Sequence, residues 1–167
     1  MFRNVIITVG CVLGISVSLG AQSKPDAEKL AGELKGDKQG TAASNKQCKL
    51  FTMAEASSYV GAKVQNMENA AMGTGCQWTV GGNNGSMLVQ VVPARYHEKP
   101  SGAPGYKKLP EIGPQAFVVP EMGGWHAGSL EGAHAVHVNL SGKGASEATA
   151  VALLKEAMKR EAAADQK

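Results

Sequence analysis

The stretch over residues 48–78 constrains the fold of this chain more than any other. Cys48 precedes a helix-start signal and an apolar run with helical spacing, and the stretch ends in a strand-like alternation that contains Cys76 and Trp78. Side chains two residues apart on a strand lie on the same face, so Cys76 shares its face with Trp78. A bond between the two cysteines would tie the start of the helix to that face and stabilise the fold by roughly 3 to 4 kcal/mol on the chain-entropy model.

The N-terminal residues predict the compartment in which such a bond could form. One cation, Arg3, precedes an almost uncharged run over residues 5–19, and small residues follow at Gly20 and Ala21. This pattern is typical of a signal peptide, and the run is shorter than the roughly 20 apolar residues that span a bilayer. We therefore predict cleavage near Gly20 or Ala21, a periplasmic or secreted location, and no stable membrane span after cleavage. A retained transmembrane helix is the alternative.

Cys11 lies inside the predicted signal peptide. Gly10 before it raises the alternative of a lipid anchor, but Thr8 occupies the position where a large aliphatic residue is expected. We therefore do not expect lipid anchoring at Cys11. Cleavage would leave Cys48 and Cys76 as the only cysteines, and two cysteines in an exported domain favour a disulfide.

The composition predicts one folded domain. Residues 22–47 are rich in polar and small side chains, with Leu30 and Leu34 as the only sizeable apolar ones, which indicates a flexible tether; a docked N-terminal helix is the alternative. A single domain over residues 48–161 and a frayed tail over residues 162–167 complete the chain. The net charge of +3 is spread along the sequence, so no basic stripe indicates nucleic-acid binding. We expect a monomer.

Local signals predict two helices. The tetrapeptide Thr-Met-Ala-Glu at residues 52–55 matches a capping box that starts a helix over residues 53–60, and Gly61 can close that helix in the left-handed conformation. Ser146 is placed to cap a second helix that runs to about Arg160.

The segments between these helices predict a sheet. Alternating or apolar patterns indicate strands over residues 74–80, 86–92, 124–130 and 133–140, and a further strand that Pro120 ends. We expect an α+β fold in which two helices pack on one face of an antiparallel sheet of four to five strands, in the order α-β-β-β-β-β-α.

The longest predicted loop covers residues 93–110, and it is the one locally basic segment with aromatic side chains. Long loops in compact domains are usually functional or disordered. A solvated crossover is one reading. The other is a contact loop, in which tyrosines supply apolar area and cations engage carboxylates, sulfates or phosphates of a partner. The candidate binding residues are Arg95, Tyr96, His97, Lys99, Tyr106, Lys107 and Lys108.

No catalytic, cofactor or metal motif stands out in the sequence. No serine lies in a Gly-x-Ser-x-Gly elbow, and the glycine-rich turn over residues 81–85 leads into a strand instead of the helix N-terminus that phosphate loops require. His134 and His137 are three residues apart, which places them on opposite faces of a strand. We therefore predict a non-enzymatic protein with no cofactor and no metal. The competing hypothesis is a hydrolase or metal-dependent enzyme whose site assembles in three dimensions from His97, His126, His134 or His137, with dispersed glutamates.

The order of these motifs resembles a known group of proteins. A cysteine before a capped helix, a Gly-Cys-x-Trp strand, a Val-rich partner strand, Leu-Pro-x-Ile-Gly-x-x-Ala-Phe, a late hairpin and a closing Ala/Leu-rich helix follow one another over residues 48–160. This order is similar to small exported bacterial proteins of unknown function, including a family of actinobacterial secreted lipoproteins in which the same two cysteines and the turn before an Ala-Phe or Ala-Tyr strand recur. The present chain departs from that family in lacking a convincing lipobox cysteine. The resemblance implies no enzyme activity and supplies no site residues.

These observations lead to one preferred hypothesis for function. The chain is expected to be an exported binding module that recognises a protein or an envelope polymer through the loop between Arg95 and Lys108. A structural or antigenic surface protein without a small ligand is a further alternative.

Overall fold

The computed structural model describes residues 40–164. The predicted signal peptide, Cys11, the tether up to residue 39 and the last three residues of the tail lie outside these residues. Between residues 40 and 164, no helix is long and apolar enough to cross a membrane.

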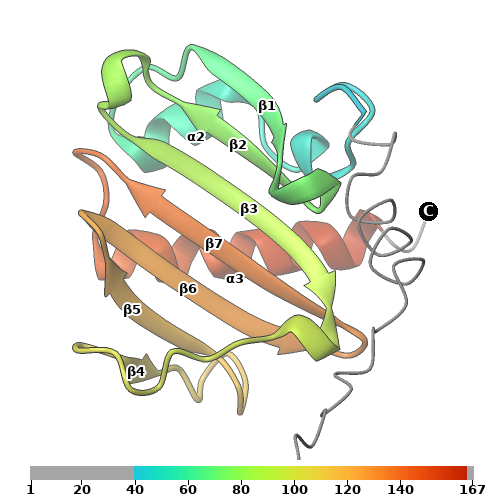
Figure 1. Cartoon of the computed structure of the whole chain (residues 1–167), viewed down its shortest axis with the longest axis vertical. Helices are drawn as coiled ribbons and strands as arrows, with labels where there is room; N and C mark the ends of the chain where they lie inside the picture. The colour runs from blue at the N-terminus through green and yellow to red at the C-terminus, as the bar shows by residue number, and fades with distance from the viewer. Residues whose placement is uncertain (1–39, 165–167) are drawn as a thin grey trace, which may run out of the picture. The chain divides into compact units, whose positions relative to one another are not determined.

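The described residues form a seven-stranded antiparallel sheet with two α-helices on one face (Figure 1). The strands are β1 Asn66–Ala70, β2 Gly75–Thr79, β3 Ser86–Pro93, β4 Lys107–Lys108, β5 Phe117–Glu121, β6 Gly124–Glu131 and β7 His134–Ser141. The helices are α2 Met53–Val60 and α3 Glu147–Ala164, and short 3-10 turns are η1 Gln47–Lys49, η2 Ala71–Gly73, η3 Gly81–Asn83 and η4 Ala94–Tyr96. The spatial order β1-β2-β3-β7-β6-β5-β4 places the last strand of the chain in the middle. The predicted α+β class with both helices on one face is confirmed, whereas the predicted count of four to five strands, and with it the predicted element order, is wrong.

Two strands that the sequence did not predict lie at the edges of the sheet. β1 has the sequence Asn-Met-Glu-Asn-Ala, made largely of residue types that are depleted in strands, and all of it pairs with β2. β4 consists of Lys107 and Lys108, which pair with Val118 and Phe117 of β5. Both strands form because the neighbouring strand presents backbone N–H and C=O groups for pairing. Local propensity does not encode the presence of that neighbour.

Pro120 lies inside β5 and does not end it. It pairs with Trp125 of β6, while β4 on the other side reaches only Phe117 and Val118. Proline has no N–H to donate, so a strand tolerates it where no partner strand lies on that side. The predicted end of this strand was therefore two residues early.

Helix α2 begins and ends where the sequence predicts. Glu55 N donates to Thr52 Oγ1 at 3.2 Å and Thr52 N donates to Glu55 Oε2 at 2.8 Å, which completes the capping box. Gly61 closes the helix at a φ of 75°, and a Cβ there would overlap the backbone nitrogen of Gly144. This glycine therefore allows the loop before α3 to pack against the end of α2.

Helix α3 ends four residues later than predicted. Its start agrees with the prediction, because Ser146 Oγ accepts a hydrogen bond from Thr149 N at 3.1 Å. Near its end Glu161 is buried and pairs with Lys46 Nζ at 2.7 Å. This tertiary contact holds a turn that local composition alone predicts to fray.

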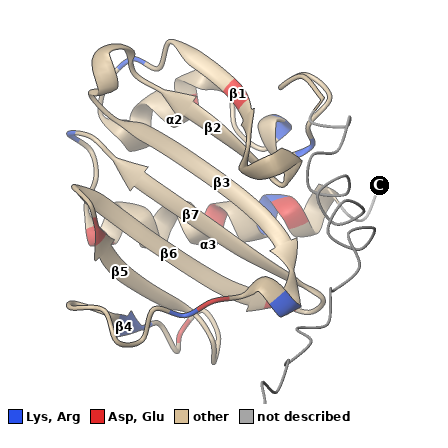
Figure 2. Cartoon of the chain, in the orientation of Figure 1, with Lys and Arg blue, Asp and Glu red and all other residues tan. Residues whose placement is uncertain are grey.

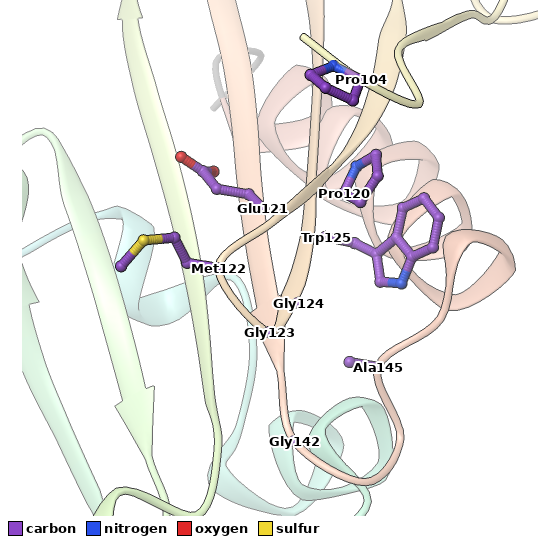
Figure 3. A pocket seen from close by; sticks show the side chains of 9 residues that line it. All are labelled: Pro104, Pro120, Glu121, Met122, Gly123, Gly124, Trp125, Gly142 and Ala145. Atoms are coloured by element: carbon purple, nitrogen blue, oxygen red, sulfur yellow. The ribbon is translucent and has the colours of Figure 1, made fainter.

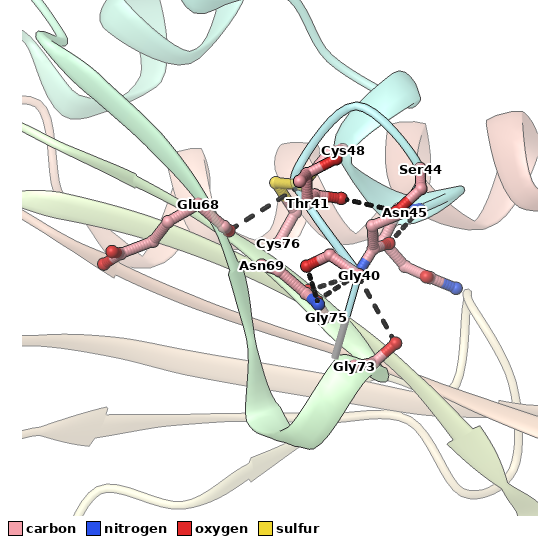
Figure 4. Close-up of a disulfide and its surroundings, with 11 residues drawn as sticks. Gly40, Thr41, Ser44, Asn45, Cys48, Glu68, Asn69, Gly73, Gly75 and Cys76 are labelled. Carbon is pink, nitrogen blue, oxygen red and sulfur yellow. Dashed lines mark hydrogen bonds between the residues drawn. A yellow bond between two sulfur atoms is a disulfide. The ribbon is translucent and has the colours of Figure 1, made fainter. Parts of the chain in front are cut away.

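The helices bury one face of the sheet. Its fully buried side chains include Trp78, Met87, Val89, Val138 and Leu140, and α3 supplies Ala150, Leu153, Leu154 and Ala157. The predicted bond between Cys48 and Cys76 is present at the edge of this core, with the two Cα atoms 5.0 Å apart (Figure 4).

Residues 40–47, which the sequence assigns to the tether, pack beside the disulfide (Figure 4). Asn45 is buried, and its Nδ2 donates to Gly75 O at 2.9 Å while its Oδ1 accepts from Gln47 N at 2.7 Å. The contacts of the folded domain therefore begin before Cys48.

Candidate functional site

The sheet face opposite the helices, called here the open face, is covered by no helix in the described part of the chain (Figure 1). The antiparallel registers align its side chains in rows that cross the strands. One row contains Gln77, Leu88, Asn139 and His126, and the next contains Gln90, His137, Gly128 and Phe117.

The central strands of the open face bear no charged side chain at neutral pH (Figure 2). Charged side chains on this face are Glu68 in β1, Lys108 in β4 and Glu121 at the end of β5. Half-buried amides and hydroxyls dominate the centre, and each can both donate and accept hydrogen bonds. These groups are Gln77, Thr79, Ser86, Gln90, Asn139 and Ser141.

The predicted contact loop packs over one end of the open face. The Tyr106 ring stacks on Phe117 with centroids 5.8 Å apart, and the His97 ring lies 5.9 Å from the same phenyl ring. Phe117 is fully buried as a result. Two of the seven predicted binding residues, His97 and Tyr106, therefore face the sheet.

The other predicted binding residues lie on the outer side of the loop and contact different parts of the surface. No single basic patch results, because the cations have separate partners. The contacts are Arg95 over the Tyr96 ring at 4.7 Å, Lys99 Nζ to Gln115 Oε1 at 3.0 Å and Lys107 Nζ to Glu147 Oε2 at 2.6 Å, with Lys108 exposed in β4.

Three histidines form a hydrogen-bonded chain where the loop meets the sheet. His97 Nδ1 lies 3.2 Å from His137 Nε2, and His126 Nε2 lies 3.0 Å from His137 Nδ1. His97 Nε2 lies 3.1 Å from the backbone oxygen of Gln115. Gly128 provides the space, since a Cβ there would lie 2.8 Å from His137 Nδ1. Side chains of the loop, β6 and β7 thus meet in one half-buried polar cluster.

The carbonyl at one end fixes the direction of this chain. Gln115 O can only accept, so His97 Nε2 bears the proton and His97 Nδ1 accepts from His137 Nε2–H. His137 Nδ1 in turn accepts from His126 Nε2–H. All three neutral rings are therefore Nε2–H tautomers, and the chain ends at His126 Nδ1, which lies 3.6 Å from Glu121 Oε2.

Burial favours the neutral form of the chain. Burial, followed by the nearby His126 and His97, lowers the pKa of His137 from 6.5 to about 4. Burial also lowers the pKa of His126, although the Glu121 carboxylate acts in the opposite direction. Titratable groups with shifted pKa values beside a surface hollow are typical of functional sites.

Hollows surround the turn between β5 and β6, close to this chain. One of about 320 Å³ is lined by His126 and Glu121 together with Glu98 and Lys99 of the loop. Another of about 500 Å³ contains Trp125, which points to the opposite side of the turn from Met122 (Figure 3). Met122 is fully exposed at a φ of 31°, a left-handed position at which glycine or asparagine is usual.

The sequence named three of these histidines only as dispersed candidates. The predicted hairpin around Glu131 and Gly132 places residues 126 and 137 diagonally on one face, so that two of the three histidines could have been found by alignment of the two strands. His97 arrives through the tertiary path of the loop, which no local pattern reveals. His134 is exposed on the opposite side of β7, as its spacing from His137 predicts.

The ring nitrogens of the cluster are engaged with one another and do not converge on a common point. Among residues 40–164 no group of three or more His, Cys, Asp and Glu side chains is arranged to hold a metal ion. The closest approach to a ligand set is the pair His126 Nδ1 and Glu121. A metal bound by two of these rings would have to displace a hydrogen bond that the cluster makes to itself.

Comparisons with known proteins assign this chain to no family. No family model, no curated protein sequence and no solved structure matches the chain. The function must therefore be argued from the geometry of the open face and the histidine chain.

Proposed function

We propose that this domain is an exported, non-enzymatic binding module that recognises a protein or an uncharged envelope polymer through the open face of its sheet. One observation supports this proposal above the others: no helix of the described residues covers a broad sheet face (Figure 1), and half-buried amides and hydroxyls line its centre. The disulfide is compatible with an extracellular location.

The side chains of the open face favour a neutral, polar partner. Gln77, Gln90 and Asn139 can pair with the amides of a peptide backbone or the hydroxyls of a glycan, and Leu88 between them supplies apolar contact. An acidic or basic partner would find no opposite charge on the central strands. Lys108, which pairs with Phe117 and shares its face, would form part of the rim of this surface.

The proposal can be tested by crosslinking from within the surface. A photo-crosslinking side chain at Leu88 of the full chain would capture the partner in cells. The same group at Ala152, exposed on α3, is the control position on the opposite side of the sheet. We expect a product that forms from position 88 and not from position 152.

Charge substitutions then separate specific binding from chance contact. The double variant Gln77→Lys, Asn139→Lys places two cations in the middle of the open face and should abolish the product from position 88. The control variant Ala148→Lys, Ala163→Lys places two cations at exposed positions of α3 and should leave the product unchanged. Equal yields from all variants would contradict the proposal.

A second candidate function is an enzyme that uses the histidine cluster for acid–base or metal chemistry. The meeting of His97, His126 and His137 beside the hollow at Glu121 favours it. Thermal unfolding with zinc, with copper and with a chelator tests the metal form, since a ligand of the native state raises the melting temperature. A rise of several degrees with metal, absent in His137→Asn, would support the enzyme over the binding module.

A further inference from the structure

The segment over residues 97–106 is attached to the sheet mainly through the histidine chain. Within the described residues, the side-chain hydrogen bonds that tie this segment to β7 and to Gln115 come from His97 and Lys99. Lys99 is exposed. Its backbone bonds are local, such as Ala103 N to Pro100 O at 2.9 Å and Tyr106 N to Ala103 O at 3.2 Å. Ring contacts of His97 and Tyr106 with Phe117 complete the attachment.

The chain can accept one proton without losing a hydrogen bond. A proton added at His126 Nδ1 makes that ring an imidazolium, and its Nε2–H still donates to His137 Nδ1. Glu121 Oε2, at 3.6 Å, lies on the side where the new N–H would point. His126 is therefore the entry point for the first proton.

A second proton cannot be accommodated in the same way. A protonated His137 would set its Nδ1–H against the Nε2–H of His126, and a protonated His97 would set its Nδ1–H against the Nε2–H of His137. Two donors then face each other at about hydrogen-bond distance, and two cations repel in a site of low dielectric. The second proton therefore breaks one of two contacts: on His97 it breaks the link between loop and sheet, and on His137 it breaks the contact of His137 with His126.

The charged groups around the cluster do not cancel this effect. Glu121 on β5 faces the entry ring His126, and Glu98 and Lys99 of the loop line the hollow beside it. The neighbours of His137 on its own face are neutral: Gln90 on β3 pairs with it directly, and Gly128 on β6 lies on its other side. Tyr106 and the exposed Lys108 approach from the loop side of Phe117.

We propose that His97, His126 and His137 form a proton-binding site that latches residues 97–106 onto the open face at neutral pH and releases them when a second proton enters the contact between His97 and His137. The latch goes beyond the proposed binding function, and it can be tested without the partner. Release would uncover Phe117 and His137 and so enlarge the open face at one end.

Hydrogen exchange of the full chain measures the latch directly. After correction for the intrinsic pH dependence of exchange, the amides of Ala103 and Tyr106 should lose at least about tenfold of their protection between about pH 7.5 and about pH 4.5, while amides of β3 and β7 stay protected. His97→Asn should show the unprotected loop at both pH values. His134→Gln, which removes an exposed histidine of the same strand, should behave like the unmodified protein.

Ring nitrogen NMR supplies a second measurement that needs no variant. At neutral pH we expect His97, His126 and His137 all to be Nε2–H tautomers, and on acidification His126 should bind a proton at Nδ1 while its Nε2–H bond to His137 persists. Loop protection that is independent of pH, or a loss that occurs equally in β3 and β7, would overturn the latch. A different tautomer on any of the three rings would overturn the chain on which it rests.

Discussion

The buried His137 predicts that this protein loses stability on mild acidification. The pKa of His137 is about 4 in the folded chain and 6.5 as the ordinary value, so between these values the unfolded chain binds more protons than the folded one. Stability therefore rises with pH in this window, is complete above about pH 6.5 and is lost as pH falls toward about pH 4.

The magnitude follows from the same two values. Each pKa unit is equivalent to about 1.4 kcal/mol, which makes the full shift worth about 3 kcal/mol. Between about pH 8 and about pH 5 the expected loss in the free energy of unfolding is about 2 kcal/mol. The lowered pKa of His126 acts in the same direction.

Urea unfolding over this pH range measures the loss. The His137→Asn variant should be less stable at pH 8 but should show a much smaller slope of stability against pH. His134→Gln is the matched control, because His134 is exposed on the same strand, and it should keep the full slope. A flat profile in the unmodified protein, or an unchanged slope in His137→Asn, would refute the reasoning.

Carboxylates do not confuse the measurement. The largest lowering of a carboxyl pKa is that of Glu55, to about 2, caused first by its hydrogen bond with Arg160. A lowered carboxyl pKa stabilises the fold above its ordinary value of 4.5, and that stability is lost only as pH falls from there toward about 2. The histidine window, from about pH 6.5 to about pH 4, therefore overlaps the Glu55 window only below pH 4.5, outside the range of this measurement.

Two further predictions concern stability at neutral pH. Removal of the disulfide by Cys48→Ala with Cys76→Ala should lower the free energy of unfolding by roughly 3 to 4 kcal/mol, measured by urea unfolding, and an unchanged midpoint would show that the cross-link does not constrain the unfolded chain. Gly61→Ala should lower the free energy of unfolding more than Gly132→Ala does in the same assay. Both glycines have positive φ, so each substitution carries an expected strain of about 1 to 2 kcal/mol. Only at position 61 would the methyl group also overlap the backbone of Gly144. Equal costs would contradict the close approach of α2 and the loop before α3.

Much of the fold could be read from local patterns. The capping box at Thr52 and Glu55 predicts the start of α2 because the two reciprocal hydrogen bonds lie within four residues of chain. The alternation around Cys76 and Trp78 predicts β2 and its buried face for the same reason. The edge strands β1 and β4 could not be predicted, because their residues pair only where a neighbouring strand is already in place.

The candidate site was less accessible to sequence reasoning. The composition of the loop over residues 93–110 predicts a basic surface that faces outward. In the structure, His97 and Tyr106 turn inward onto Phe117. Burial of these rings follows from the apolar surface that Phe117 offers, and that surface belongs to a strand distant in sequence. Composition cannot report which side of a loop faces the sheet.

The sequence by itself determined the features whose causes are local: the helix caps, the alternation of buried and open faces along most strands, and the presence of two cysteines close enough in the chain to form a disulfide. The tertiary structure alone decided that β7 also pairs with β3 and that the loop brings His97 to His137, which the predicted β6–β7 hairpin sets beside Gly128 and His126. Strand order depends on how helices and strands share one core, and its energy is summed over contacts far apart in sequence. The histidine chain exists only as a consequence of that order.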